Sequence, residues 1–218
     1  MKIKAVIFDM DGVITSSTFE HFEAWKVLAK KLKFSIKDEV EEHTKGLSRM
    51  DSLEVILTHC NLNGKYSKEE KIKIATDKNA IYQSMISQFT PNNLLPGVLT
   101  LLKELKSLNI KIALASASKN GPFLIERLEI SEYFDYIVNP ACLKAGKPSP
   151  EIFLKAAAEL GISTKFCVGI EDAIAGVSSI KSAGMIAVGI GDENILTQAD
   201  IVYKDCSEID LTKVDNLL

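Results

Sequence analysis

The sequence predicts an α/β fold in which a doubly wound parallel sheet carries an inserted helical domain. Three observations support this fold class. Short apolar runs end in small or polar residues, helical patterns separate several of these runs, and one long stretch after the first run shows helical periodicity only. Short, uniformly apolar runs are typical of strands that helices cover on both faces of a sheet.

Six apolar runs are expected to form the strands. The first begins at residue 5 and stops at Asp9, whereas the others follow after residue 109. Helical patterns lie between several of them, with apolar residues three and four apart, so neighbouring strands should run parallel. The six runs are residues 5–8, 110–115, 136–138, 167–170, 186–190 and 201–203.

A helical domain is expected between the first and second strands. Three apolar stripes predict its helices: Phe22, Trp25, Ala29 and Leu32; Leu53, Ile56 and Leu57; Ile72, Ala75 and Tyr82. We therefore expect a core domain of residues 1–14 and 94–218 and a helical domain of residues 15–93. An insertion after the first strand lies at the carboxyl ends of the strands, where open α/β sheets bind ligands.

Composition narrows the function. The chain has 218 residues, 26 Lys and Arg against 29 Asp and Glu, and 46% hydrophobic residues, which is typical of a soluble globular protein. A net charge of -3 provides no basic stripe for nucleic acid. We find no signal peptide, membrane span or paired cysteine motif, so we expect a cytoplasmic protein with free thiols. No motif sets the oligomeric state, and a monomer is the expectation.

Two acidic pairs follow predicted strands. Asp9 and Asp11 end the first strand, where residues two apart point the same way. Glu171 and Asp172 end the strand of residues 167–170, so a parallel sheet brings both pairs to one edge. Hard oxygen ligands of this kind suit Mg²⁺. Solvated acids at a strand end, or an acidic helix start favoured by the helix dipole, are the alternatives.

Two further segments after strands offer groups that bind phosphate. Ser116 provides a hydroxyl beside backbone N–H donors, and Lys147 provides an ammonium group that can neutralise developing charge. Taken singly, each has a simpler interpretation: a serine that caps a helix, and a solvated lysine before a proline. Their order along the chain, together with the acidic pairs, favours a phosphoryl-transfer site.

In these four ordered motifs the sequence resembles the haloacid dehalogenase-like phosphotransferases, over essentially its whole length. The resemblance implies that Asp9 is the nucleophile that forms an aspartyl-phosphate and that Asp11 is the general acid and base. It also implies that Ser116 and Lys147 bind the phosphoryl group. Mg²⁺ would be held by Asp9, Asp11 through its carbonyl, Asp172 and Glu171, the last directly or through water.

The helical insertion contains three further candidates. His21 lies beside the predicted stripe of Trp25, and such a histidine is often structural. Arg49, which ends the segment of residues 45–49, has the planar donor fork that suits a second phosphate. Lys78 lies on the predicted third helix, where a solvated lysine is the simpler interpretation.

The acidic pair after the first strand, His21 with Trp25, and the segments of residues 45–49 and 115–121 are similar to those of the β-phosphoglucomutase family. The resemblance implies interconversion of β-D-glucose 1-phosphate and β-D-glucose 6-phosphate, with β-D-glucose 1,6-bisphosphate as activator and intermediate. The insertion would be a helical cap in which His21 positions Asp11 and Arg49 grips the distal phosphate. The implied substrate-binding residues are Trp25, Gly46, Leu47, Arg49, Ser52, Lys78, Ser116, Ala117, Ser118, Lys119 and Asn120.

Two departures from the family pattern and two competing functions complete the interpretation. Ser16 stands where the family often has Asp, and Ala173 stands where Ser is common. The first lies in the expected hinge, and the second should alter only hydrogen bonding around the acidic pair. A sugar-phosphate phosphatase on the same scaffold is the nearest alternative. A non-catalytic sensor would be expected to lose Asp9 or Asp11, and both are present.

Overall fold

The structure is a computed structural model that describes residues 1–45 and 47–218. The chain forms two compact units: Met1–Ser16 together with Phe89–Leu218, and Ser17–Gln88. We call them the core unit and the helical unit. The domain boundaries expected from the sequence, after residues 14 and 93, lie within a few residues of these divisions. No helix among the described residues is long and apolar enough to cross a membrane.

The core unit contains one parallel sheet of six strands, in the order β3-β2-β1-β4-β5-β6. This confirms the predicted fold class. Each strand lies in one of the apolar runs, with ends that shift by a residue or so. The strands are β1 (Ala5–Phe8), β2 (Lys111–Leu114), β3 (Tyr136–Ile137), β4 (Cys167–Glu171), β5 (Ile186–Ile190) and β6 (Ile201–Tyr203).

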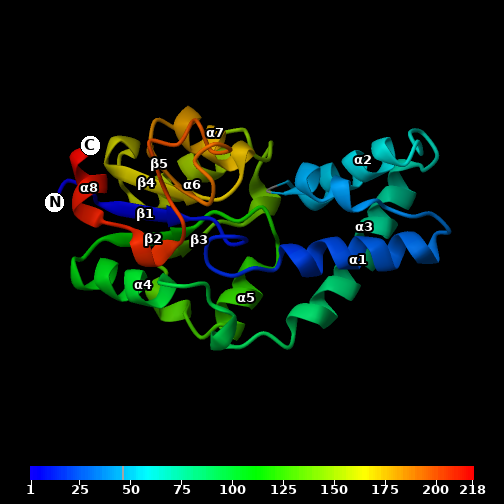
Figure 1. Ribbon diagram of the computed structural model, residues 1–218, viewed down its shortest axis with the longest axis horizontal. Helices are drawn as coiled ribbons and strands as arrows, with labels where there is room; N and C mark the ends of the chain where they lie inside the picture. Colours follow the sequence, from blue (N-terminus) through cyan, green and yellow to red (C-terminus); the bar gives the residue numbers. More distant parts are fainter. Residues whose placement is uncertain (46) are drawn as a thin grey trace. The chain divides into compact units, whose positions relative to one another are not determined.

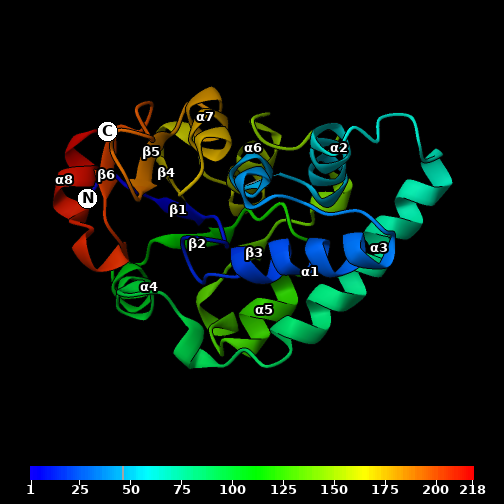
Figure 2. The ribbon, with the colours of Figure 1, turned by 45° about the vertical axis from the view of Figure 1, so that its right-hand side comes forward.

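Helices cover both faces of this sheet, as Figure 1 shows. On one face lie α6 (Glu151–Leu160) and α7 (Ile174–Ser182), and on the other α4 (Val98–Ser107) and α5 (Gly121–Arg127). The C-terminal α8 (Leu211–Asn216) lies near the N-terminus of the chain (Figure 2). Phe153 of α6 and Ile180 of α7 belong to the same buried apolar cluster as Ile7 of β1. Burial of apolar area in such layers provides most of the stability of a domain.

The pairing of β1 brings three strand ends together. Phe8 is opposite Leu114 of β2 and Ile170 of β4. The residues that follow, Asp9 and Glu171 among them, therefore lie at one edge of the sheet. In the strand order observed, the direction of winding reverses between β1 and β4, and ligands of open α/β sheets bind at that position.

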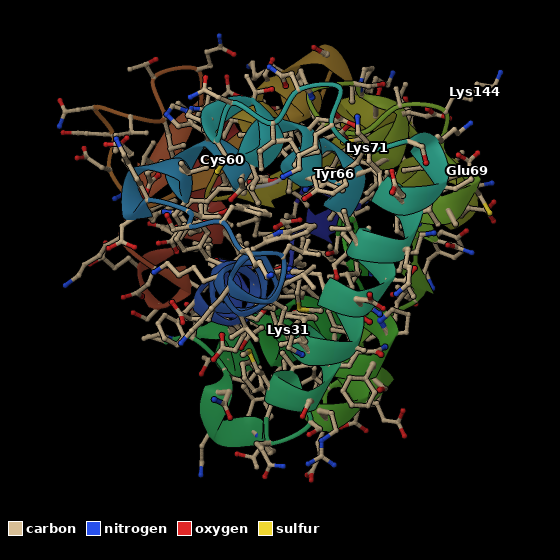
Figure 3. The ribbon with its side chains drawn as sticks, turned by 90° about the vertical axis from the view of Figure 1, so that its right-hand side faces the viewer. Lys31, Cys60, Tyr66, Glu69, Lys71 and Lys144 are labelled. Atoms are coloured by element: carbon tan, nitrogen blue, oxygen red, sulfur yellow. The ribbon has the colours of Figure 1, made fainter. Side chains whose placement is uncertain are left out.

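The helical unit consists of α1 (Thr18–Lys31), α2 (Arg49–His59) and α3 (Lys68–Ile86), which Figure 3 shows with their side chains. Tyr66 lies in the loop before α3, and Glu69 in the first turn of that helix. The unit has its own apolar core, which includes Phe22, Trp25, Leu28, Leu53, Ile56, Leu57, Ile74 and Ala75.

One stripe predicted for this unit is partly wrong. Ile72 is 51% exposed, because the buried face of α3 follows a spacing of four through Ile74, Lys78, Tyr82 and Ile86. Residues four apart lie above one another on a helix, and Ile72 falls outside that row. The sequence pattern was misread because a lysine interrupts the row.

Short 3-10 helices occupy several of the connections. In the helical unit they precede α2, and in the core unit they lie between the regular elements. They are Asp38–Val40, Glu42–Thr44, Pro91–Asn93, Ser131–Tyr133, Pro140–Cys142, Thr164–Phe166 and Cys206–Glu208.

Candidate active site

A buried lysine joins two of the predicted acidic residues. The Nζ atom of Lys147 donates to Asp9 Oδ1 and to Glu171 Oε1, each at 2.6 Å. All three side chains are buried, and Glu171 has no exposed surface. An ammonium group so placed compensates both carboxylates, which a low-dielectric site would otherwise disfavour. The structure thus brings the predicted nucleophile and the predicted lysine into direct contact.

Three carboxylates gather beside this lysine. One oxygen each from Asp9, Glu171 and Asp172 lies within 4.8 Å of the other two. Carboxylate oxygens are the donors that Mg²⁺ and Ca²⁺ prefer. Glu171 also accepts the N–H of Ala173 at 2.8 Å, so its two oxygens contact Lys147 and the backbone. The Ala173 contact uses the main chain, so the departure from serine at this position preserves it.

The electrostatics of this cluster favour a cation. Burial raises the pKa of Asp9 to about 7, with Lys147 acting in the opposite direction and Glu171 adding to the rise. Burial and the neighbouring Glu171 and Asp9 carboxylates raise the pKa of Asp172 to about 9. Burial lowers the pKa of Lys147, but the two carboxylates outweigh it and the net shift is upward. Crowded carboxylates of this kind become fully ionised more readily when a divalent ion is bound.

Two glycines allow the acidic groups to approach the backbone. Gly12, with φ of +80°, follows Asp11, and a Cβ atom there would lie 1.9 Å from Asp172 Oδ2. A Cβ atom on Gly176 of α7 would lie 1.8 Å from Glu171 Oε1. Any larger residue at either position would collide with a carboxylate. Glycine at position 12 therefore meets both a conformational requirement, the positive φ, and a packing requirement.

The loop after β2 holds Ser116 in a network of backbone donors. Ser116 is buried, and its Oγ atom accepts the N–H of Ser118 at 3.1 Å. The Ser118 Oγ atom in turn accepts the N–H of Asn120 at 3.2 Å. Asn120 is buried, Ala117 is partly buried and Lys119 is exposed. These bonds fix the loop immediately before α5.

The loop that carries Lys147 is anchored at both ends. The Glu151 carboxylate, at the start of α6, accepts the N–H of Lys144 at 2.9 Å and that of Ala145 at 2.9 Å. Ser179 of α7 donates to the carbonyl of Ser149 at 2.6 Å. Sequence reasoning missed both anchors. The acid that directly follows the Ser149-Pro150 pair was the available signal for the first of them.

In the helical unit the structure joins His21 and Lys78. The Nζ atom of Lys78 lies 2.6 Å from Nδ1 of His21. Lys78 is 1% exposed, so the expectation of a solvated helix lysine is wrong. An ammonium group can only donate, and so Nδ1 accepts and the neutral ring carries its proton on Nε2. Burial, with Lys78 and Arg49 adding to its effect, lowers the pKa of His21 well below its usual value.

Aromatic rings surround His21 and Lys78. The sequence analysis placed Tyr82 in an apolar stripe but did not predict its contact with His21. Tyr82 stacks on His21 with ring centroids 3.8 Å apart, and it accepts or donates a 2.7 Å hydrogen bond with Ser17. The Lys78 ammonium lies 4.8 Å from the Tyr82 centroid and 5.1 Å from that of Trp25. Cation–π attraction compensates part of the desolvation of Lys78. The signal for this contact in the sequence was the spacing of four between Lys78 and Tyr82, which places both on one face of α3.

Arg49 begins α2 and is fixed by a partner on α3. Its Nη2 atom donates to Asn79 Oδ1 at 2.6 Å. Burial lowers the pKa of Arg49. Ser52 is buried, with its hydroxyl 3.5 Å from the Thr44 carbonyl, and Leu47 is partly buried. The prediction for Gly46 lies outside the described residues.

The strand-end motifs, the acidic cluster and the separate helical unit define a class of protein. The model of the haloacid dehalogenase-like hydrolases matches residues 3–184, and the chain belongs to this family. This confirms the resemblance inferred from the four motifs.

Comparison with individual proteins shows which members of this family the chain is similar to. The chain is 48% identical to beta-phosphoglucomutase of Bacillus subtilis (strain 168) over 209 residues, which cover 96% of this chain and 92% of the relative. The crystal structure of beta-phosphoglucomutase from Clostridium difficile matches with a TM-score of 0.95 and 42% identity, covering 98% of this chain and 96% of the other. The phosphorylated carbohydrates phosphatase of Thermotoga maritima is 29% identical over 84% of this chain and 82% of its own length. The β-phosphoglucomutase resemblance is thereby confirmed.

Proposed function

We propose that the protein is a phosphomutase that interconverts β-D-glucose 1-phosphate and β-D-glucose 6-phosphate. The similarity to the two β-phosphoglucomutases over nearly the whole chain supports this activity. The single structural observation that carries it is Arg49. A partly buried guanidinium group, fixed in orientation and located on a unit separate from Asp9, provides for a phosphate that does not react.

In the proposed mechanism, Asp9 attacks the phosphorus atom and forms an aspartyl-phosphate. The ammonium group of Lys147 donates a hydrogen bond to the attacking carboxylate of Asp9. It is therefore close enough to neutralise charge on the phosphoryl oxygens as they approach. The hydroxyl of Ser116 donates a hydrogen bond to one of these oxygens. Asp11 protonates the departing sugar oxygen and later removes the proton from the attacking hydroxyl.

The residues present fit a divalent cation of the Mg²⁺ type. Asp9 and Asp172 would hold it, with the carbonyl of Asp11 as a further donor and Glu171 acting directly or through water. Bound there, Mg²⁺ reduces the repulsion between a carboxylate nucleophile and a phosphate dianion. Because Glu171 contacts Lys147 and a backbone N–H, its main contribution in this proposal is to orient the lysine.

The helical unit, residues 15–93 in the sequence prediction, acts as the cap in this proposal. His21 presents its Nε2 proton, since Lys78 donates to Nδ1, and so it can position Asp11 by donating to it. Arg49 binds the distal phosphate, and Lys78 and Trp25 contribute to the sugar-phosphate site. β-D-glucose 1,6-bisphosphate acts as activator and intermediate. The cytoplasmic location and the monomeric state stay predictions.

The test is an assay with Mg²⁺, β-D-glucose 1-phosphate and a trace of the 1,6-bisphosphate, in which glucose 6-phosphate and free phosphate are followed together. We expect glucose 6-phosphate with little free phosphate. The Asp9→Asn variant should lose both products and the phosphoenzyme detected by mass spectrometry. A phosphate-only outcome would favour the second candidate, a sugar-phosphate phosphatase, which the similarity to the Thermotoga maritima phosphatase supports.

A further inference from the structure

The partner of Arg49 is an amide, and this choice has a consequence for anion binding. Arg49 Nη2 donates to Asn79 Oδ1 at 2.6 Å, between the first turn of α2 and the middle of α3. Arginines in folded proteins commonly pair with carboxylates, which fix the guanidinium plane but also cancel its charge. An amide oxygen fixes the same plane and leaves the positive charge available.

We propose that Asn79 is a positioning and specificity-determining residue, which orients the Arg49 guanidinium group for the non-reacting phosphate of the substrate without neutralising it. This inference rests on the proposed function, in which Arg49 binds that phosphate. It assigns to Asn79 no contact with the reacting atoms.

The surroundings of Arg49 agree with this role. Lys78, the residue before Asn79, is buried, and His21 lies close enough to Arg49 for the guanidinium charge to lower the pKa of its imidazole. The positive charges of Arg49 and Lys78 therefore both lie near His21, which itself stays neutral. A dianionic phosphate gains from each of these charges, and a carboxylate at position 79 would remove part of that gain.

Two substitutions separate orientation from charge. Asn79→Ala removes the acceptor, and Asn79→Asp keeps an acceptor of the same size but adds a negative charge beside Arg49. A charge-assisted hydrogen bond contributes about 1.5–3 kcal/mol, so we expect the KM for β-D-glucose 1-phosphate to rise roughly tenfold to hundredfold. The rise should be larger for Asn79→Asp. Ala80→Asp, which places the same charge at the neighbouring exposed position, is the matched control and should stay near the wild-type KM.

A second substrate distinguishes positioning from damage to the core unit. The one phosphate of p-nitrophenyl phosphate is the group that Asp9 attacks, whereas in the proposed cycle the phosphate of β-D-glucose 1-phosphate binds Arg49 while the sugar receives the phosphoryl group from Asp9. Hydrolysis of p-nitrophenyl phosphate should therefore be unchanged in both Asn79 variants. Equal losses on both substrates would overturn the inference, and so would a wild-type KM in Asn79→Asp. The thermal unfolding of each variant shows whether it is folded, and the isosteric Asn79→Asp keeps the test available if Asn79→Ala does not fold.

A double-mutant cycle with Arg49→Lys completes the test. If Asn79 acts through Arg49, the effects of Arg49→Lys and Asn79→Ala on KM should be strongly non-additive, whereas additive effects would contradict the inference. Failure of the proposed function gives a different result. In that case the wild-type protein itself would form no glucose 6-phosphate, whatever residue stands at position 79.

Discussion

At the scale of single residues, the chemistry depends on buried charges that are paired. Lys147 lies between Asp9 and Glu171, and Lys78 lies between an imidazole and two aromatic rings. Each lysine loses its hydration and regains stabilisation from its partners. Removing a partner therefore leaves an uncompensated charge in a low-dielectric environment, which destabilises the folded state.

Lys147→Met should destabilise the protein strongly. The substitution leaves the buried carboxylates of Asp9 and Glu171 without their cation, which typically costs about 3–5 kcal/mol. We expect the free energy of unfolding in urea, measured without divalent cations, to fall by an amount of this order. Lys155→Met is the control, because Lys155 pairs with Glu159 on the surface of α6, where water screens the two charges and the pair contributes little to stability. Equal stabilities of the two variants would contradict the prediction.

His21 should make the protein less stable in acid. Burial and the nearby cations lower the pKa of His21 in the folded state well below 6.5, so below pH 6.5 the unfolded chain binds a proton that the folded chain does not. Stability is therefore complete above pH 6.5 and is lost as the pH falls toward the folded-state pKa, at up to about 1.4 kcal/mol per pH unit. His21→Gln should have a flatter dependence between pH 7.5 and 5 than the wild type. The exposed His59→Gln should keep the wild-type slope.

At the scale of elements, residues of α6 and α7 hold the loop that carries Lys147. Glu151, the first residue of α6, binds two N–H groups of the loop that leads to Lys147, and Ser179 of α7 binds the loop that follows it. Gly176, also on α7, has no side chain that would collide with the Glu171 carboxylate. The two helices that cover one face of the sheet thus also position the lysine and the glutamate.

Glu151→Gln should lower kcat without loss of the fold. In the wild type, Oε1 accepts the N–H of Lys144, and Oε2 accepts the N–H groups of both Lys144 and Ala145. The amide has no charge and only one acceptor oxygen, so the Lys147 loop loses part of its anchorage. Misplacement of a reacting group by about 1 Å can reduce a rate by up to about 100-fold. Steady-state kinetics should show the fall in kcat with a nearly unchanged melting temperature. Glu159→Gln, on the same helix but paired only with Lys155 in an exposed bridge, is the matched control.

At the scale of the whole molecule, the chain divides the work between two units with separate cores. The core unit contains the proposed nucleophile Asp9, together with Lys147 and the acidic cluster. The helical unit contains Arg49, His21 and Lys78. Separate cores allow each unit to keep its own geometry, which suits the proposed mechanism, in which a bisphosphate is bound, released and bound again.

Divalent metal should stabilise the core unit selectively. A ligand at 100 times its Kd stabilises the folded state by about 2.7 kcal/mol, so calorimetry should show a higher melting temperature in Mg²⁺ than in a chelator. If the two units melt separately, only the transition of the core unit should move. Asp172→Asn should abolish most of the shift. Asp77→Asn, in the helical unit where Asp77 pairs with Lys73, should leave the shift intact.

The sequence by itself determined the parallel sheet, the helical insertion and the positions of the candidate site residues at the strand ends. Uniformly apolar runs specify buried strands, and residues such as Asp9 and Glu171 stand directly after them, so local pattern is sufficient. Only the tertiary structure decided that Lys78 is buried against His21, that Arg49 donates a hydrogen bond to Asn79, and that Glu151 anchors the Lys147 loop. These contacts join residues on different elements, and the partner that makes burial of a charge favourable cannot be read from the charged residue's own neighbours in the chain.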